Sequence, residues 1–277
     1  MPVGQLRDNA ITALFEQPKI VIGVVHSKAL PGAPKYNGGP VSEIYDYALA
    51  EAQRYAEAGV DGLIVENHGD IPFLKPDAIG PETAACMAIM TERVRVATGL
   101  PIGVNVLANG AVQALAIAQA SGASFIRVNQ WSNAYVANEG IIEGPAAAAL
   151  RYRKTIGAEA IRIFADAHVK HGAHAITADR SIEELARDNE FFDADVAIAT
   201  GQRTGNAATE EELATIAEAT SLPVVVGSGV SEDNVERIMS IASGVIIASS
   251  LKKDGVWWNP VDPARARNFM RVVEDLR

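Results

Sequence analysis

Short apolar runs alternate along the chain with longer segments in which apolar residues recur at helical spacing. The runs contain four to seven residues, as expected for strands buried on both faces. Strict alternation of strand and helix predicts a parallel sheet covered by helices. The predicted strands are Ile20–His26, Gly62–Asn67, Ile102–Val106, Phe125–Asn129, Ile161–Asp166, Val196–Thr200, Val224–Gly227 and Val245–Ser249.

The helical segments between these runs begin at recognisable capping sequences. Ser181-Ile-Glu-Glu184 and Thr209-Glu-Glu-Glu212 are capping boxes, and Ser231, followed by two acidic residues, is expected to open another helix. The predicted helices are Ile44–Ala58, Glu82–Ala97, Val112–Ala120, Ala146–Thr155, Glu183–Phe191, Glu211–Ala219, Asp233–Ile241 and Ala264–Leu276.

Eight strand–helix units favour a closed (β/α)8 TIM barrel over an open sheet. The sequence before the third strand, Thr98-Gly-Leu-Pro-Ile-Gly-Val104, is similar to Thr220-Ser-Leu-Pro-Val-Val-Val226 before the seventh. The fourth and eighth strands are similar in the same way, as expected of two half-barrels. No linker or shift of composition divides the chain. We therefore predict one domain over residues 1–277, with residues 1–19 as a lead-in segment.

Polar residues occur at the carboxyl ends of the predicted strands. Side chains alternate across a strand, so Ile126 and Val128 are expected to face the helices and Arg127 and Asn129 the barrel interior. TIM-barrel active sites lie at the carboxyl ends of the strands. The candidate catalytic residues are His26, Glu66, Asn105, Arg127, Asn129, Asp166 and His168.

Several roles are open to these residues. Asp166 or Glu66 would act as a base and His168 or His26 as an acid. Arg127, with Asn105 and Asn129, would stabilise a developing oxyanion. A divalent metal ion held by Glu66, Asp166 and His168 is an alternative. A further alternative is a purely structural role, in which Arg127 forms a salt bridge with Glu66 or Asp166. A Schiff-base aldolase is disfavoured, since no predicted strand contains lysine.

The loops after the last two strands are rich in small residues. Val226-Gly-Ser-Gly-Val230 follows the seventh strand, and Ala248-Ser-Ser-Leu-Lys-Lys-Asp-Gly255 follows the eighth. Small residues let backbone N–H groups approach an anion, and barrels commonly bind phosphate at these two loops. The predicted phosphate-binding residues are Gly227, Ser228, Gly229, Ser249 and Ser250.

Thr200-Gly-Gln-Arg-Thr-Gly-Asn206 follows the sixth strand and places basic and polar residues between two glycines. This composition suggests a lid that closes over a ligand and excludes water. The residues concerned are Gly201, Arg203 and Gly205. An exposed turn without such a role is the alternative.

Charge and composition narrow the class of partner. The chain of 277 residues has a net charge of −10 and no basic run, which argues against nucleic-acid binding. No apolar run is long enough to span a membrane, and the single cysteine, Cys86, fits a reducing compartment. We therefore expect a cytoplasmic protein. Trp257 and Trp258 are expected to pack the last helix or to join a contact in a homo-oligomer.

The sequence resembles the BtpA/SgcQ family of the phosphate-binding TIM-barrel superfamily. The resemblance runs through Ile22-Gly-Val-Val-His26, Ala58-Gly-Val-Asp-Gly-Leu-Ile-Val-Glu-Asn67, Phe125-Ile-Arg-Val-Asn129, Phe164-Ala-Asp-Ala-His-Val-Lys-His171 and Gly227-Ser-Gly-Val230. It implies a phosphate-binding barrel. The family takes its name from a cyanobacterial factor needed for accumulation of photosystem I.

Two functions follow as hypotheses. The first is an enzyme acting on a small phosphorylated metabolite, similar to a sugar phosphate, by acid–base isomerisation or epimerisation or by metal-assisted lyase chemistry. The second is a non-enzymatic assembly or regulatory factor on a barrel scaffold, because a fold alone does not imply a function. A converging set of polar residues favours the enzyme, whereas a scaffold would show an exposed apolar patch.

Overall fold

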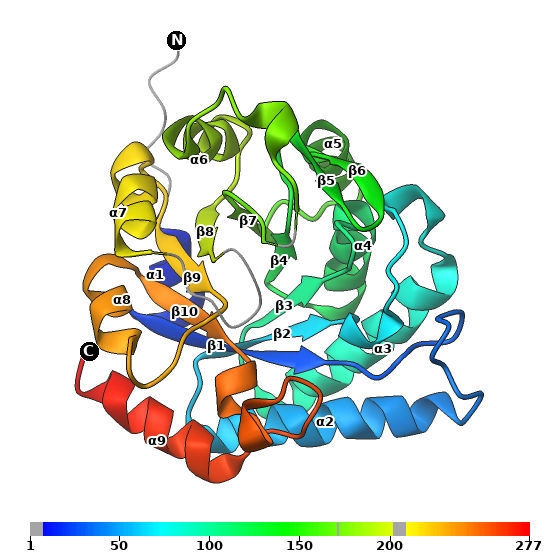
Figure 1. The fold of residues 1–277 in the computed structure, drawn as a ribbon. Helices are drawn as coiled ribbons and strands as arrows, with labels where there is room; N and C mark the ends of the chain where they lie inside the picture. Colours follow the sequence, from blue (N-terminus) through cyan, green and yellow to red (C-terminus); the bar gives the residue numbers. More distant parts are fainter. Residues whose placement is uncertain (1–7, 171, 202–208) are drawn as a thin grey trace.

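A computed structural model describes residues 8–170, 172–201 and 209–277 of the protein. Eight parallel strands form a closed barrel in the order β1-β10-β9-β8-β7-β4-β3-β2 (Figure 1). The predicted barrel is confirmed, and each predicted strand agrees with an observed one to within two residues at either end. The barrel strands are β1 (Ile20–His26), β2 (Gly62–Glu66), β3 (Ile102–Asn105), β4 (Phe125–Val128), β7 (Arg162–Asp166), β8 (Val196–Thr200), β9 (Val224–Gly227) and β10 (Gly244–Ile247).

Helices surround the barrel and cover its outer face (Figure 1). The side chains of Ser181 and Thr209 accept hydrogen bonds from the N–H groups of Glu184 and Glu212, so both predicted caps are confirmed. The helix expected near Ser231 begins later, because a turn stabilised by Asn234 precedes it. The helices are α1 (Ala10–Phe15), α2 (Val41–Ala58), α3 (Pro81–Thr98), α4 (Ala111–Ser121), α5 (Ala146–Thr155), α6 (Ile182–Phe191), α7 (Glu210–Ala219), α8 (Val235–Ile241) and α9 (Pro263–Glu274).

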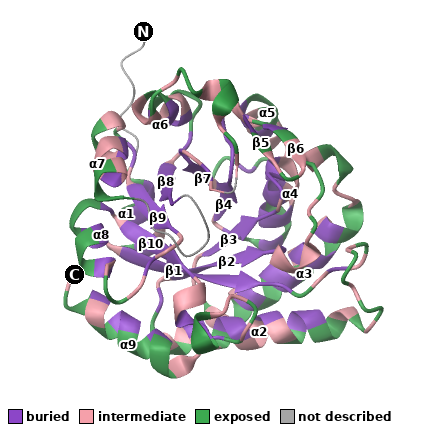
Figure 2. Cartoon of the chain, in the orientation of Figure 1, coloured by how far each residue is buried: buried purple, intermediate pink, exposed green. Residues whose placement is uncertain are grey.

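The core has two layers, one between strands and helices and one inside the barrel (Figure 2). Ile126 and Val128 belong to the outer layer, as predicted. Phe125 and Phe164 stack inside the barrel with ring centroids 4.4 Å apart. Phe15 of α1 packs edge-on against Phe125, so part of the expected lead-in segment fills the barrel interior.

An antiparallel hairpin that the sequence reading missed lies between β4 and α5. It consists of β5 (Ala134–Ala137) and β6 (Gly140–Glu143). A bridge between Val136 and Ala173 joins it to the segment after β7. The strands are short and only partly buried, which leaves a weak alternating pattern.

A buried ion pair joins the loop after β10 to α2. Lys252 and Glu51 are both fully buried, with Nζ and Oε2 3.1 Å apart, and Glu51 also accepts the N–H of Val261. Lys252 is therefore not free to meet an anion, although the sequence placed two lysines near the expected phosphate. Lys253 is exposed.

Candidate active site

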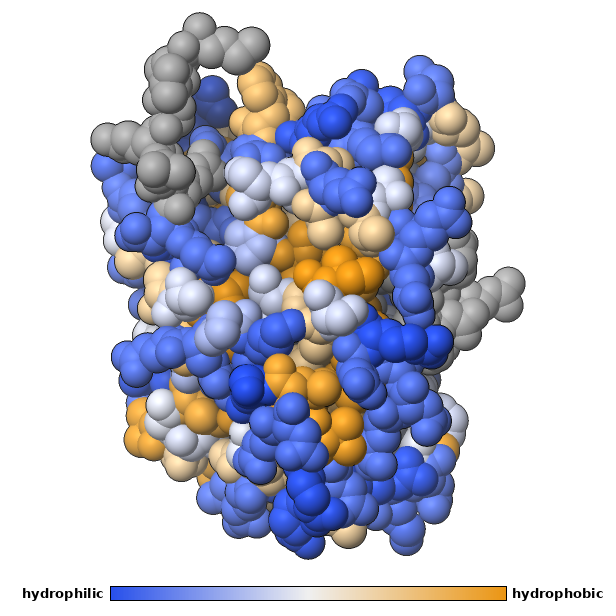
Figure 3. All heavy atoms as spheres, turned by 90° about the vertical axis from the view of Figure 1, so that its left-hand side faces the viewer, coloured by the Kyte–Doolittle hydropathy of each residue, from blue (hydrophilic) through white to orange (hydrophobic). Residues whose placement is uncertain are grey.

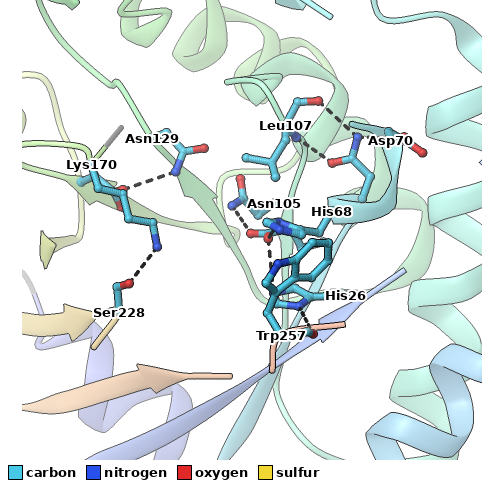
Figure 4. A network of polar contacts seen from close by, with 12 residues as sticks. His26, His68, Asp70, Asn105, Leu107, Asn129, Lys170, Ser228 and Trp257 are labelled. Carbon is cyan, nitrogen blue, oxygen red and sulfur yellow. Dashed lines mark hydrogen bonds and ion pairs between the residues drawn. The ribbon is translucent and has the colours of Figure 1, made fainter. Parts of the chain in front are cut away.

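Six of the seven predicted catalytic residues are buried at the carboxyl ends of β1, β2, β3, β4 and β7. They form two neighbouring polar groups, one around Glu66 and one around Asp166. Figure 4 shows His26 and Asn105 of the first group and Asn129 of the second. The charge of Arg127 acts on both carboxylates, which links the groups electrostatically. The seventh residue, His168, lies elsewhere.

The first group contains His26, Glu66 and Asn105, together with His68, which the sequence reading missed. Oε1 of Glu66 lies 3.0 Å from Nδ1 of His68 and 3.6 Å from Nε2 of His26. Oε2 accepts a 2.6 Å hydrogen bond from Nδ2 of Asn105. The two imidazole rings stack with centroids 4.5 Å apart.

The turn η1 (His68–Asp70) positions His68. Asn67, considered beside Glu66 as the polar end of the second strand, accepts the N–H of Leu107 and donates to Asp70. Asp70 in turn accepts the N–H of Leu30. This network joins the loops after β1, β2 and β3 and holds the histidine over the end of β2.

Burial disfavours the charged forms of both His26 and Glu66, so it moves their pKa values in opposite directions. It lowers the pKa of His26 to about 3, against the opposing attraction of Glu66, so the imidazole is neutral at physiological pH. Burial alone would raise the pKa of Glu66. The hydrogen bond and charge of His68, with the charges of His26 and Arg127, outweigh that effect and lower the pKa well below its usual range.

In the second group, Arg127 donates two hydrogen bonds of 3.0 Å to the carboxylate of Asp166. Asn129 donates a third, of 3.3 Å. Burial disfavours the charged guanidinium, but the paired carboxylate outweighs this and raises the pKa of Arg127. The salt bridge weighed as a structural alternative is therefore present.

His168 does not join Asp166 in the mouth, as strand alternation had suggested. Its ring lies 3.9 Å from that of His174, and Nδ1 is 4.0 Å from Oε1 of Glu212, beside a separate cavity of about 420 Å³. Burial and His174 lower its pKa to about 4. The strand ends at Asp166, so the two-residue period no longer applies. The expected grouping of Glu66, Asp166 and His168 is not assembled.

Lys170 occupies the mouth instead and is a second residue that the sequence reading missed. Its Nζ donates a 2.9 Å hydrogen bond to Oγ of Ser228, on the loop after β9 (Figure 4). Burial and the charge of Arg127 lower its pKa to about 8, although Glu66 and Asp166 oppose the shift. The argument against a Schiff-base aldolase considered only residues within strands, and Lys170 lies beyond the end of β7.

The two expected phosphate loops lie side by side, since β9 pairs with β10. Oγ of Ser250 donates to the carbonyl of Val230, and Asn234 donates to that of Gly229. Ser228 has a φ of 87°, a left-handed conformation uncommon outside glycine. Among the described residues, no protein acceptor is found for the amides of Gly229, Val230, Ser249 and Ser250.

The expected lid falls largely outside the described residues, including Arg203 and Gly205. Gly201 is described and buried, directly after Thr200. Thr200 donates a 2.7 Å hydrogen bond from Oγ1 to the carbonyl of His168.

A cavity of about 330 Å³ opens beside His26 and His68. Trp257 closes one side and lies edge-on to both imidazoles, with its centroid 4.4 Å from that of His68. Tyr36, Tyr47 and Lys28 also line it. Trp258, the other member of the tryptophan pair, is 65% exposed.

These features define a (β/α)8-barrel protein with a buried polar site at the carboxyl ends of its strands. The chain belongs to the BtpA family, whose model matches residues 17–275. In the described part of the chain, no helix combines the length and apolar character needed to cross a membrane.

Relatives in all three domains of life match almost the whole chain. An uncharacterized protein of Archaeoglobus fulgidus is 41% identical, covering 92% of this chain and 99% of its own. An uncharacterized mitochondrial protein of Caenorhabditis elegans is 39% identical, covering 93% and 94%. The photosystem I biogenesis protein BtpA of Synechocystis is 38% identical, covering 94% and 90%.

Solved structures share the barrel at low sequence identity. Phosphoribosylanthranilate isomerase of Pyrococcus furiosus is 15% identical with a TM-score of 0.56, covering 93% of this chain and 99% of its own. Orotidine 5'-phosphate decarboxylase of Pyrococcus horikoshii is 10% identical with a TM-score of 0.57, covering 92% and 99%. This likeness concerns the fold.

Proposed function

We propose that the protein is an enzyme that transfers a proton beside the carbonyl group of a small phosphorylated polyhydroxy compound, similar to a sugar phosphate. The observation that carries this proposal is a pair of buried amide oxygens. Among the described residues, Oδ1 of Asn105 and Oδ1 of Asn129 have no hydrogen-bond partner.

The orientation of both amides follows from their neighbours. Each Nδ2 donates to a carboxylate, Asn105 to Glu66 and Asn129 to Asp166, so each oxygen is left as an acceptor. A buried acceptor without a donor is costly, by about 1–3 kcal/mol. Hydroxyl groups of a substrate would supply the missing donors, which favours a polyol or sugar skeleton.

The phosphate would lie at Gly227, Ser228, Gly229, Ser249 and Ser250. Among the described residues, the amides of Gly229, Val230, Ser249 and Ser250 have no protein acceptor, which supports this assignment. Two solved barrels of the same fold, phosphoribosylanthranilate isomerase and orotidine 5'-phosphate decarboxylase, are named for phosphorylated compounds, which agrees with the proposal.

We assign proton transfer to Lys170, because it lies in the mouth beside Ser228 and its pKa, lowered to about 8, leaves part of the amine neutral near physiological pH. In this scheme its neutral amine takes a proton from the carbon beside the carbonyl and returns it to the neighbouring carbon or the opposite face. Arg127 stabilises the enolate oxygen. Asp166 positions Arg127, and the neutral imidazole of His26 exchanges the proton of the carbonyl oxygen when no metal ion is bound at Glu66.

The test is a screen of phosphorylated sugars and polyols, each beside its unphosphorylated parent, by thermal shift. Binders are then incubated with the protein in D2O, and deuterium at the carbon beside the carbonyl is followed by NMR. We expect exchange with at least one phosphorylated binder. Binders that show neither exchange nor turnover would contradict the proposed chemistry.

Variants separate phosphate binding from folding. Ser249→Asp places a negative charge at the loop after β10 and should weaken phosphorylated binders at least tenfold. Ser240→Asp, at the exposed end of α8, is the matched control. Equal effects of the two substitutions on affinity would contradict phosphate binding at these loops.

A scaffold function is the second candidate, favoured by the name of the Synechocystis relative. Phe191 is 80% exposed, as a contact surface would require. On the flank that carries α7 and α8, however, apolar residues lie in narrow areas among hydrophilic ones (Figure 3). A screen without any phosphorylated binder, together with a stable protein complex, would support this function.

A further inference from the structure

Three potential metal ligands converge at the ends of β1 and β2. Nε2 of His26, Oε1 of Glu66 and Nδ1 of His68 are within reach of one ion, since ligand atoms from these residues lie within 4.8 Å of one another. Two ligands bound about 2.0–2.2 Å from one ion at roughly tetrahedral angles lie about 3.3–3.6 Å apart. The observed spacings from Glu66 Oε1, 3.0 and 3.6 Å, are close to this range. The two imidazole rings stack at an interplanar angle of 23°, so they must turn for both lone pairs to face one ion.

Neighbouring groups hold the ligands in the required orientation. Asn105 binds the second carboxylate oxygen of Glu66 and leaves the first directed at the histidines. Nδ1 of His26 lies 3.5 Å from the carbonyl oxygen of Trp257. A proton on that nitrogen would leave the lone pair on Nε2, which faces Glu66. Metal sites typically contain such outer hydrogen bonds.

We propose that His26, Glu66 and His68 bind one divalent first-row transition metal ion, such as Zn²⁺, Mn²⁺ or Co²⁺. Two imidazoles and one carboxylate suit these ions, whereas Mg²⁺ and Ca²⁺ prefer oxygen ligands. Three protein ligands leave at least one coordination position for water or substrate. The cavity beside His26 and His68 provides access to it.

The same residues without a metal would form a hydrogen-bonded relay, with His68 donating to Glu66. The two arrangements differ in one measurable property, because a relay has no stoichiometric affinity for a cation. Binding of the ion is independent of the proposed function. Its use as a Lewis acid on the substrate carbonyl rests on that function.

The experiment measures metal uptake in the absence of any substrate. The whole protein is stripped with a chelator, titrated separately with Zn²⁺, Mn²⁺ and Mg²⁺ by calorimetry, and analysed for bound metal after dialysis. Co²⁺ adds a visible absorption spectrum that reports nitrogen ligation. We expect one tightly bound transition metal ion per chain and no comparable uptake of Mg²⁺.

Glu66→Gln and His68→Ala should each lower the affinity at least a hundredfold. Asn105→Ala should lower it about 10–100-fold through loss of the outer hydrogen bond. The control is His174→Ala, which alters the other histidine pair. Circular dichroism establishes whether each variant is folded. If a ligand variant does not fold, the metal affinity of Asn105→Ala is the test.

Absence of uptake, or uptake lost in His174→Ala but kept in Glu66→Gln, would overturn the proposal. Failure to bind metal leaves the deuterium-exchange experiment unaffected. Metal binding without deuterium exchange would support the metal site and contradict the proposed reaction. The two failures are therefore distinguishable.

Discussion

Arg127 at the end of β4 and Asp166 at the end of β7 form a bidentate ion pair, with two hydrogen bonds of 3.0 Å between neighbouring strands. Their side chains are 7% and 0% exposed. Ion pairs of this kind cost desolvation energy but fix geometry, and removal of one partner leaves a buried charge. The pair therefore fixes the position of the guanidinium at the mouth of the barrel.

Replacing Asp166 with Asn should reduce both stability and activity. The neutral amide keeps the shape but leaves Arg127 without a counter-ion, so we expect a loss of about 3–5 kcal/mol in the free energy of unfolding. Loss of a well-positioned oxyanion donor typically costs about 10²–10³ in kcat. Denaturant titration measures the first effect, and the exchange assay with a phosphorylated binder measures the second.

The double variant Arg127→Met with Asp166→Leu serves as the control for Asp166→Asn. With both charges removed, stability should recover toward that of the wild-type protein while activity stays low. A double variant less stable than Asp166→Asn would show that the pair itself stabilises the barrel. Unchanged turnover in either variant would remove the pair from the mechanism.

Lys252 provides a second stability prediction. Lys252→Met removes the fully buried partner of Glu51 and leaves Arg54 as its remaining cation, so we expect a loss of about 1–3 kcal/mol in the free energy of unfolding. Lys253→Met, which changes the exposed neighbouring lysine, should stay within about 0.5 kcal/mol of wild type. Urea denaturation of both variants is the measurement, and equal effects would contradict the prediction.

Inside the barrel, the ring of Phe125 leaves no room for a side chain at Gly103. A Cβ at this position would lie 2.2 Å from Cε2 of that ring, which is stacked on Phe164. Gly103→Ala should therefore cost about 1–3 kcal/mol of stability by overpacking. Adding Phe125→Leu should reverse part of the loss, because the smaller side chain leaves room. Strictly additive effects in the double variant would argue against this contact.

The residues within strands were the predictable part of the site. Asn105 and Arg127 are placed by the two-residue period of β3 and β4, and closure of the barrel brings their ends together. The inner and outer layers of the core follow from the same period. This physical rule holds as long as the backbone remains extended.

The residues beyond the strand ends were not predictable in this way. His68 lies on a turn whose direction depends on hydrogen bonds from Asn67 to another loop. After Asp166 the backbone bends, and His168 points away while Lys170 enters the mouth. The only sequence signal for Lys170 was its place four residues after Asp166, in Phe164-Ala-Asp-Ala-His-Val-Lys-His171. Tertiary contacts, rather than local pattern, decide these positions.

The pKa of Lys170 leads to the last prediction, which concerns the pH dependence of anion binding. Because its pKa is lowered to about 8, the ammonium is largely charged at pH 7 and largely neutral at pH 9.5. Sulfate is a suitable probe, since its own charge is constant over this range. A charge-assisted hydrogen bond contributes about 1.5–3 kcal/mol, equivalent to about 10–150-fold in affinity. Calorimetry should show sulfate affinity falling by up to about 30-fold from pH 7 to pH 9.5, because the charged fraction of free Lys170 falls by about this factor.

Lys170→Met should bind sulfate weakly at pH 7 and show little further loss at pH 9.5, because the titrating cation is gone. Lys253→Met is the matched control and should keep the pH dependence of the wild-type protein. Bound sulfate favours the ammonium, so its presence should move the midpoint above 8. A wild-type affinity that stays constant across this range would place the anion away from Lys170 and Ser228.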